Sequence, residues 1–361
     1  MIALTKSFKY LTPFVLYLLA LIAFKETGIA CWYTLLYTFF VIPFLELFIK
    51  ADPKNLDEVE EALAKKNRGY EEALAKKNRG YDFVLYAAVV LQYYSLWIFF
   101  HAVQEANISN WDLAGRIVSM GLLCGAFGIN VAHELGHRVN KFEQFLAKML
   151  LLTSLYMHFF IEHNKGHHKH VATASDPSTA KYNQSLYAFW PQTLMGTYLS
   201  AWKIANEELS KKGQPIFSLR NEMLLFQIIQ LLFLVGIFIL FGWTTTLLFM
   251  VAALMGGLLL ESVNYIEHYG LTRNETENHQ FERVQPHHSW NSNHIIGRLM
   301  LFELSRHSDH HYLASRKYQI LRSFDNAPQM PTGYPGMILL SLVPPLWFKV
   351  MNNRMKKYNL K

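Results

Sequence analysis

Long apolar runs separated by short polar segments are the dominant pattern of this 361-residue chain. Five of the runs reach about 20 residues, the length at which an α-helix spans a hydrocarbon core of about 30 Å. The first run is shorter, but Lys9 and Lys25 can extend their charged ends to the membrane surface. The pattern predicts a single all-α, polytopic membrane domain (1–361) with six transmembrane helices, at 8–25, 30–49, 83–103, 113–132, 223–243 and 247–266.

Basic residues set the expected orientation of these helices. The 50–81 segment carries eight Lys and Arg residues, whereas the short connections 104–111 and 242–246 carry none. Cytosolic loops of membrane proteins are enriched in Lys and Arg. We therefore expect the 50–81 loop, both termini and the part after the last span (267–361) to lie in the cytosol.

The 50–81 loop also contains a tandem duplication. Residues 60–70 read EEALAKKNRGY, and residues 71–81 repeat them identically. Each copy reads as a short charged helix that ends at Asn, in a solvated connection. We attach no function to it.

Composition supports the membrane assignment and excludes other classes. Hydrophobic residues make up 52% and charged residues 17%, against about 25% charged in an average soluble domain. Cys31 and Cys124 are too few for a disulfide scaffold, a thiolate iron–sulfur cluster or a Cys-rich zinc module. The net charge of +7 could suit nucleic acid, but basic cytosolic loops explain it, and we expect no nucleic-acid partner.

Histidine clusters are the main chemical signal. Residues at i, i+3 and i+4 share a helix face, and neutral imidazole binds zinc, copper, iron and nickel. Burying many unpaired imidazoles near lipid is costly, and a metal compensates for that cost. Nine candidates exceed the needs of one ion, so the pattern predicts two metals on the cytosolic side. The nine are His133, His137, His163, His167, His168, His268, His307, His310 and His311.

Two further features bear on this site. If the apolar run 145–161 spanned the membrane, the histidines before and after it would lie on opposite faces, so we expect it to be re-entrant or buried. The HELGH string also matches the H-E-x-x-H signature of zinc metalloproteases, with Glu134 as general base. That alternative leaves most of the nine histidines without a role.

Five strings in this order resemble the integral-membrane alkane 1-monooxygenases, within the wider family of histidine-box hydroxylases and desaturases: HELGHR, EHNKGHHKHVATASDPSTA, NYIEHYGL, PHHSWNSNH and LSRHSDHH. The resemblance runs from the first span to PTGYPG at 331–336, and the duplication at 60–81 departs from it. It implies that the nine histidines bind two non-haem irons (Fe²⁺/Fe³⁺). It also implies terminal hydroxylation of medium- or long-chain n-alkanes to 1-alkanols with O₂, using electrons from rubredoxin, itself reduced by a rubredoxin reductase, in a bacterial inner membrane.

Polar residues near the histidines are candidates for orienting them. A ligating imidazole usually donates its second N–H to a carboxylate or carbonyl. We expect Asp176 and Asp309 to accept such bonds, with helix capping or ion pairs to Arg138 or Arg306 as the alternative. Further candidates are Glu162, Glu267 and Asn264, whereas His287, His288 and His294 are expected to have structural or docking roles.

An apolar substrate would need a channel through the helices. Small residues at Gly256 and Gly257 leave room for a ligand or allow close helix packing. We expect bulky side chains to limit substrate length by blocking the channel: Trp32, Phe39, Phe40 and Trp97.

Electrons must come from another protein. The sequence has neither a Gly-rich dinucleotide fingerprint nor a Cys-x-x-Cys pair, so we expect no flavin, NAD or fused rubredoxin. An acidic carrier would suit a basic cytosolic face, although the same residues also fit the general enrichment of Lys and Arg there. The candidate docking residues are Arg138, Lys141, Lys165, Lys169, Arg298 and Arg306.

Three other functions remain as alternatives. An aryl-methyl hydroxylase or a fatty acyl desaturase would use a similar site on a different substrate. A metal transporter would need polar residues continuing through the spans. Glu46, Gln92, Arg116 and Asn130 are scattered and form no such line.

Overall fold

The structure of the protein is a computed structural model that describes residues 7–55, 79–278 and 280–360. The duplicated segment lies outside the described residues except for its last three positions, 79–81. Within the described part the chain is helical, and β pairing is limited to two isolated bridges, Glu275–Phe281 and Asn291–Gln329. The all-α prediction is therefore confirmed.

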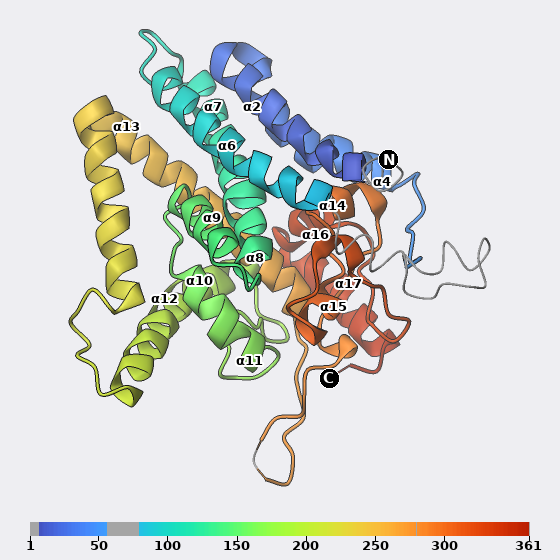
Figure 1. Cartoon of the computed structure of the whole chain (residues 1–361). Coiled ribbons are helices and arrows are strands. Elements are labelled where there is room, and N and C mark those ends of the chain that lie inside the picture. Colours follow the sequence, from blue (N-terminus) through green and yellow to red (C-terminus); the bar gives the residue numbers. More distant parts are fainter. Residues whose placement is uncertain (1–6, 56–78, 279, 361) are drawn as a thin grey trace.

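Five helical stretches in the described part are long and apolar enough to cross a membrane (Figure 1). They correspond to the first four predicted spans and to a fifth, longer stretch that covers the last two. In chain order they are η1–α2 (Phe8–Lys25), η2 to α4 (Gly28–Glu46), α6 (Arg79–Ala102), α7–η4–α8 (Asn110–Gly136) and α13 (Glu222–His268).

The fifth stretch, α13, consists of two arms. Straight, its 47 residues would extend about 70 Å, more than twice the thickness of a bilayer core. The backbone leaves the helix at Gly242 (φ 79°, ψ 176°), a left-handed region that favours glycine. In Figure 1 the yellow and orange arms diverge from this point. The predicted spans 223–243 and 247–266 are these two arms, joined by a tighter turn than expected.

The remaining helices, most of them short except for the 26-residue α12, complete the part of the molecule that carries the histidines (Figure 1). Side-chain caps such as Ser185 on Ala188 N and Asn221 on Met223 N begin two of the helices. The α-helices are α9 (Lys141–Leu152), α10 (Phe159–Glu162), α11 (His168–His170), α12 (Leu186–Lys211), α14 (Ile295–Met300), α15 (His307–Tyr312), α16 (Tyr334–Ser341) and α17 (Pro344–Lys357).

The apolar run 145–161 is not one continuous helix. It comprises the end of α9, a turn in which Leu155 has φ 50°, and the start of α10. Leu150 and Leu151 are fully buried against the neighbouring helices. The segment thus brings the second histidine string to the same end of the bundle as the first.

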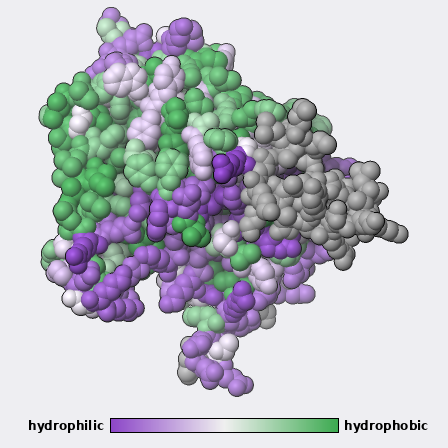
Figure 2. Space-filling model, viewed as in Figure 1, coloured by the Kyte–Doolittle hydropathy of each residue, from purple (hydrophilic) through white to green (hydrophobic). Residues whose placement is uncertain are grey.

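The surface divides into an apolar part and a polar part. Leu18, Val90, Leu231 and Ile239 are apolar side chains more than 60% exposed, as expected for residues that face lipid. Figure 2 shows this apolar surface over the upper helices and a polar surface below, around α11, α15 and α17. This distribution is that of a multi-pass membrane protein with a substantial water-facing part.

The last arm of α13 packs very closely against the fourth span. A Cβ added at Gly256 would lie 2.6 Å from Cys124 Cβ and 3.0 Å from the Gly125 nitrogen. The adjoining π-helical segment η4 (Cys124–Ile129) is fully buried. Gly257 faces the Tyr156 ring. These glycines therefore serve close helix packing, the alternative that the sequence left open.

We predict that Gly256→Ala lowers the thermal unfolding midpoint in detergent, by an amount equivalent to about 1–3 kcal/mol, because the added methyl group has no room. The matched control is Gly236→Ala in the same helix, where an added Cβ meets no atom within 4 Å. There the better helix propensity of alanine should leave the midpoint unchanged or slightly higher. Equal shifts for the two variants would contradict the close contact.

Candidate metal centre

Four separate segments bring the nine histidines together. His133 lies in α8 (Asn130–Gly136) and His137 caps the end of that helix. The second string spans α10, the π-helical turn η5 (His163–His167) and α11. His268 is the last residue of α13, and α15 supplies the remaining three histidines. The structure thus places all nine predicted residues at one site.

The histidines form two groups rather than one. The first group contains His133, His137, His163, His168 and His310. Their Nε2 atoms face one another: His133 to His310 at 2.8 Å, His137 to His163 at 3.1 Å, His163 to His168 at 3.1 Å and His168 to His310 at 3.0 Å.

The second group contains His167, His268, His307 and His311. The Nε2 of His307 lies 3.1 Å from that of His268 and 2.9 Å from that of His311. The His167 ring centroid lies 4.9 Å from that of His268 and 4.8 Å from that of His311. The two groups adjoin, since the rings of His168 and His311 are 4.5 Å apart.

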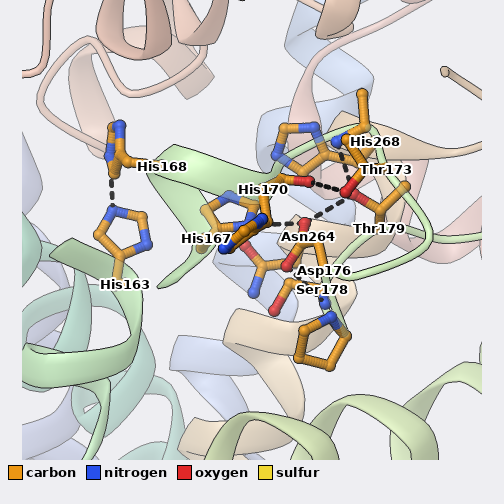
Figure 3. Close-up of polar contacts among 12 residues, drawn as sticks. His163, His167, His168, His170, Thr173, Asp176, Ser178, Thr179, Asn264 and His268 are labelled. Atoms are coloured by element: carbon orange, nitrogen blue, oxygen red, sulfur yellow. Dashed lines mark hydrogen bonds and ion pairs between the residues drawn. The ribbon is translucent and has the colours of Figure 1, made fainter. Parts of the chain in front are cut away.

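The π-helical turn η5 explains why the histidines of the EHNKGHHKH string contribute to both groups. In an α-helix His163 and His167, four residues apart, would face the same site. In the wider turn η5, His163 instead meets His168, five residues on, at 3.1 Å (Figure 3). His167 turns to the other group. π-Helical turns frequently occur at functional sites.

These nitrogen contacts fit metal ions better than they fit hydrogen bonds. A neutral imidazole has one N–H donor, yet His163 Nε2 faces both His137 and His168, and His168 Nε2 also faces His310. One N–H cannot point at two nitrogens at once, so some of these contacts are left without a hydrogen bond unless a cation lies between the nitrogens. Ligands at right angles, each about 2.1 Å from one metal, would lie about 3.0 Å apart, close to the observed spacings.

Burial keeps five of the histidines that lie outside the membrane-spanning segments in the neutral form that binds metal. It lowers the pKa of His163, His168, His307, His310 and His311, and the neighbouring histidines lower these pKa values further. The five imidazoles are thus neutral at pH 7, as ligation requires.

Asp176 orients His167. Its Oδ2 lies 2.9 Å from His167 Nδ1 and accepts a 2.6 Å hydrogen bond from Thr179 Oγ1 (Figure 3). Burial alone would lower the pKa of His167, but the Asp176 carboxylate raises it. A proton held on Nδ1 leaves Nε2 free as a ligand atom. This is the arrangement that the sequence predicted for Asp176.

The comparisons with known proteins point the same way. The fatty acid desaturase family model matches residues 109–341, which include all nine histidines. Alkane 1-monooxygenase 2 of Pseudomonas aeruginosa is 40% identical over 91% of this chain and 84% of its own length. Alkane 1-monooxygenase 2 of Alcanivorax borkumensis is 38% identical over 91% of this chain and 83% of its own length. This chain belongs to the alkane 1-monooxygenase family. A xylene/toluene monooxygenase hydroxylase component of Pseudomonas putida is also similar, at 31% identity over 66% of this chain and 63% of its own length.

The position of Glu134 does not suit the protease alternative. In this alkane 1-monooxygenase homologue, Glu134 Oε1 accepts hydrogen bonds from Arg138 at 2.6 and 3.0 Å and from the Tyr318 nitrogen at 3.3 Å. A general base must lie within hydrogen-bond reach of the proton that it removes. Here the carboxylate instead forms a buried ion pair.

Of the other predicted orienting residues, Glu267 lies near a histidine of the site, whereas Glu162, Asn264 and Asp309 form hydrogen bonds to other residues. Glu267 Oε1 lies 3.2 Å from His307 Nδ1. Glu162 accepts a 3.3 Å bond from Ser200, and Asn264 donates to Glu261 at 3.0 Å. Asp309 accepts from the Arg322 nitrogen at 2.8 Å and lies 3.1 Å from Arg316 Nε, so these contacts anchor the segment after α15.

Two buried residues near the site were not predicted from the sequence, Glu261 and Tyr334. Glu261 accepts hydrogen bonds from Tyr156 at 2.7 Å, Thr193 at 2.5 Å and Asn264. An ionisable residue in an otherwise apolar run is costly, and that signal could have identified it. Tyr334 donates to Glu267 at 2.6 Å, and no spacing rule in the sequence linked the two.

A third cluster, Glu282, His287 and His288, has metal-like spacing but unsuitable protonation. His288 Nδ1 accepts a 3.0 Å hydrogen bond from the Gln285 nitrogen. Burial lowers the pKa of His288 to about 4, so at pH 7 its single proton lies on Nε2, facing Glu282 at 3.4 Å. A protonated nitrogen cannot bind a metal.

A narrow apolar cavity of about 60 Å³ is lined by residues of α8, α13, α14 and α16. Asn130 and Leu304 line it, each three residues before a histidine of the site, His133 and His307. Phe39 also lines this cavity. The other predicted channel aromatics lie elsewhere: Trp32 stacks on Trp111, Phe40 is 65% exposed, and Trp97 packs on His101 and Phe241.

A polar cleft of about 1040 Å³ includes Asp176 in its lining. It lies between α12 and the 165–182 segment. The cleft therefore reaches the carboxylate that orients His167. Its walls carry five lysines and two glutamates: Lys165, Lys169, Lys181, Lys203, Lys211, Glu207 and Glu208.

The predicted docking arginines are not at the surface. Arg138, Arg298 and Arg306 are each at most 7% exposed. Arg298 pairs with Glu303 at 2.7 Å, and Arg306 donates to the backbone oxygens of Lys54 and Leu321. The docking prediction was wrong for these three: Arg298 and Arg306 bond the backbone of the segment 50–55, and Arg138 forms a buried ion pair with Glu134. Lys141, Lys165 and Lys169 are exposed.

We predict that His311→Gln lowers the metal content of the purified protein, because the four-histidine group loses a ligand. His287→Gln, in the third cluster, is the matched control and should retain the full metal content. Elemental analysis after identical purification measures both. An equal loss in both variants would contradict the assignment of the groups.

Proposed function

We propose that the protein is an alkane 1-monooxygenase that hydroxylates the terminal carbon of n-alkanes with O₂ at a di-iron centre. The observation that carries this proposal is a pair of all-imidazole groups held in part by helices, α8 and α13, that also line an apolar cavity. Membership of the family supports the reaction type, and the alkane 1-monooxygenase relatives support the substrate class.

The chemistry of the substrate favours iron over zinc. An alkane has no carbonyl or phosphoryl oxygen that a Lewis acid could polarise, so its C–H bond needs an oxidant. Two groups of five and four histidines provide enough ligands for two separate ions. When bound, two irons would supply the redox chemistry that inserts one oxygen atom of O₂ into the C–H bond and releases the other as water. The histidines hold the metals, and the surrounding side chains exclude solvent.

The cavity favours reaction at a chain end. At about 60 Å³ it is much smaller than typical pockets for whole small molecules, at about 300–1,000 Å³. Its walls are nearly all apolar, from Leu16 and Ile42 to Ile338. One end of an alkane could thus lie near the histidines while the remainder extends among the apolar helices.

The polar cleft supports electron delivery by a protein carrier. Lysines outnumber glutamates on its walls, which would attract an acidic protein. We propose that rubredoxin, reduced by a rubredoxin reductase, docks there, since the cleft leads to Asp176 and His167. Lys165 and Lys169, two of the expected docking residues, line it.

The basic 50–81 loop supports a cytosolic site in a bacterial inner membrane. Its described beginning packs against the histidine-bearing part: Asp52 N donates to Asn293 O at 2.9 Å, and Asn55 Nδ2 donates to Ser323 O at 3.1 Å. If the enrichment of Lys and Arg places this loop in the cytosol, the histidines lie on the same side.

An aryl-methyl hydroxylase is the second candidate, because the xylene/toluene monooxygenase component is 31% identical. The desaturase alternative has the family model in its favour, but the relatives named above are monooxygenases.

The test is a reconstituted reaction of the purified, iron-loaded protein with rubredoxin, its reductase, NADH and octane under ¹⁸O₂. We expect 1-octanol with one ¹⁸O atom and no product without O₂. An alkene product would favour a desaturase, and strong preference for xylene would favour an aryl-methyl hydroxylase. Absence of product from every substrate would contradict the proposal.

We predict that Phe39→Ala increases the longest alkane accepted, because Phe39 lines the cavity. Trp97→Ala removes a comparable aromatic far from the cavity and should leave the length profile unchanged. Product yields across a series of n-alkanes measure the effect. An identical profile for Phe39→Ala and the wild type would contradict the cavity assignment.

We also predict that Lys203→Glu, in the cleft wall, raises the KM for rubredoxin several-fold without changing the KM for octane. The effect should weaken at high salt, because exposed charges are screened. Lys141→Glu makes the same charge change outside the cleft and is the control. An equal rise in both variants would show that only the general basic surface matters.

A further inference from the structure

Tyr334 lies between the apolar cavity and the four-histidine group. It is the first residue of α16, its side chain is 1% exposed, and it forms part of the cavity wall. Its hydroxyl donates a 2.6 Å hydrogen bond to Glu267 Oε1. One side chain therefore contacts both the proposed substrate space and a buried carboxylate.

Glu267 continues this connection to the histidines. It precedes His268 at the end of α13, it is 1% exposed, and its Oε1 lies 3.2 Å from Nδ1 of His307. A buried carboxylate needs donors to be stable. The Tyr334 hydroxyl supplies one, whereas Nδ1 of His307 lies close to the carboxylate without hydrogen-bond geometry. A carboxylate that accepts the second N–H of a metal-binding histidine fixes the orientation of its ring, and the 3.2 Å separation places Glu267 within reach of that role.

Glu46 fixes the backbone on the other side of Tyr334. Glu46, at the end of the second apolar stretch, accepts a 2.9 Å hydrogen bond from the Gly297 nitrogen. Its carboxylate occupies the space where a side chain at Gly333 would lie. Gly297, Tyr334 and Pro335 all line the cavity. This part of the wall is thus fixed at Glu46 on one side and at Glu267 on the other.

We propose that Tyr334 is a positioning residue that links occupancy of the cavity to the orientation of His307. An apolar chain in the cavity packs against the Tyr334 ring, whose hydroxyl holds Glu267 next to His307. Without the hydroxyl, the Glu267 carboxylate loses a donor and can rotate away from the imidazole. The inference rests on the proposed function, because it requires metal at the histidines and an alkane in the cavity.

The test compares Tyr334→Phe, which removes only the hydroxyl, with Ile338→Val. Ile338 lines the same cavity one helical turn further on and is the matched control. The readouts are the rate of iron loss to a chelator, the Mössbauer spectrum with and without octane, and kcat and KM for octane.

For Tyr334→Phe we expect iron loss about 10-fold faster than in the wild type, at the low end of what loss of such a partner costs. We also expect an altered spectrum that no longer responds to octane, and a lower kcat at similar KM. Ile338→Val should keep the wild-type iron loss and spectrum and change only the KM. A Tyr334→Phe protein with wild-type iron retention, spectrum and kcat would overturn the inference.

Glu267→Gln provides a second, independent variant. It keeps the shape of the side chain and removes its charge, so it should release iron faster as well. If Tyr334 acts through Glu267, the double variant should lose iron no faster than Glu267→Gln alone. Fully additive effects would overturn the inference even if each single variant is impaired. If the wild-type protein forms 1-octanol and the variants behave identically to it, this inference alone is overturned. If the wild-type protein has no iron and forms no product, the proposed function is overturned as well.

Discussion

The structure depends on imidazole nitrogens that face one another at close range inside the protein. Neighbouring Nε2 atoms lie 2.8–3.1 Å apart across both groups. Neutral imidazoles have too few protons to turn all these contacts into hydrogen bonds. Positive charge between the nitrogens turns the same contacts into stabilising ones, so the fold and metal binding are coupled.

The rest of the architecture brings two different environments to these nitrogens. The apolar helices line a narrow cavity whose wall includes Asn130 and Leu304, each three residues before a histidine of the site, while the polar cleft reaches Asp176. An apolar substrate and a charged redox partner could therefore reach the same centre by separate routes. Electrostatic steering would favour the partner on the polar side, and burial of apolar surface would favour the substrate on the other.

Much of this could be predicted from the sequence, because hydrophobic runs and histidine spacing are local signals. The spans, the nine histidines and the orienting role of Asp176 depend on residues near in sequence or on strong composition. The division into two groups could not be predicted, since it depends on the π-helical turn that separates His163 from His167. A helical spacing rule assigns both to one face.

Residues whose role depends on distant contacts were predicted least well. Arg298 and Arg306 resemble surface cations in the sequence but are buried among Glu303 and backbone oxygens. Tyr334 meets Glu267 across 67 positions of the chain. Trp97 and Phe39 are both bulky aromatics in spans, and only the packing of the helices shows which one lines the cavity.

X-ray absorption at the iron edge of the purified protein, with iron quantified per chain, tests the central claim most directly. We expect two irons per chain, each with a nitrogen-rich coordination shell at about 2.1 Å, typical of imidazole ligands. One iron per chain at full activity, zinc in place of iron, or sulfur in the coordination shell would contradict the account.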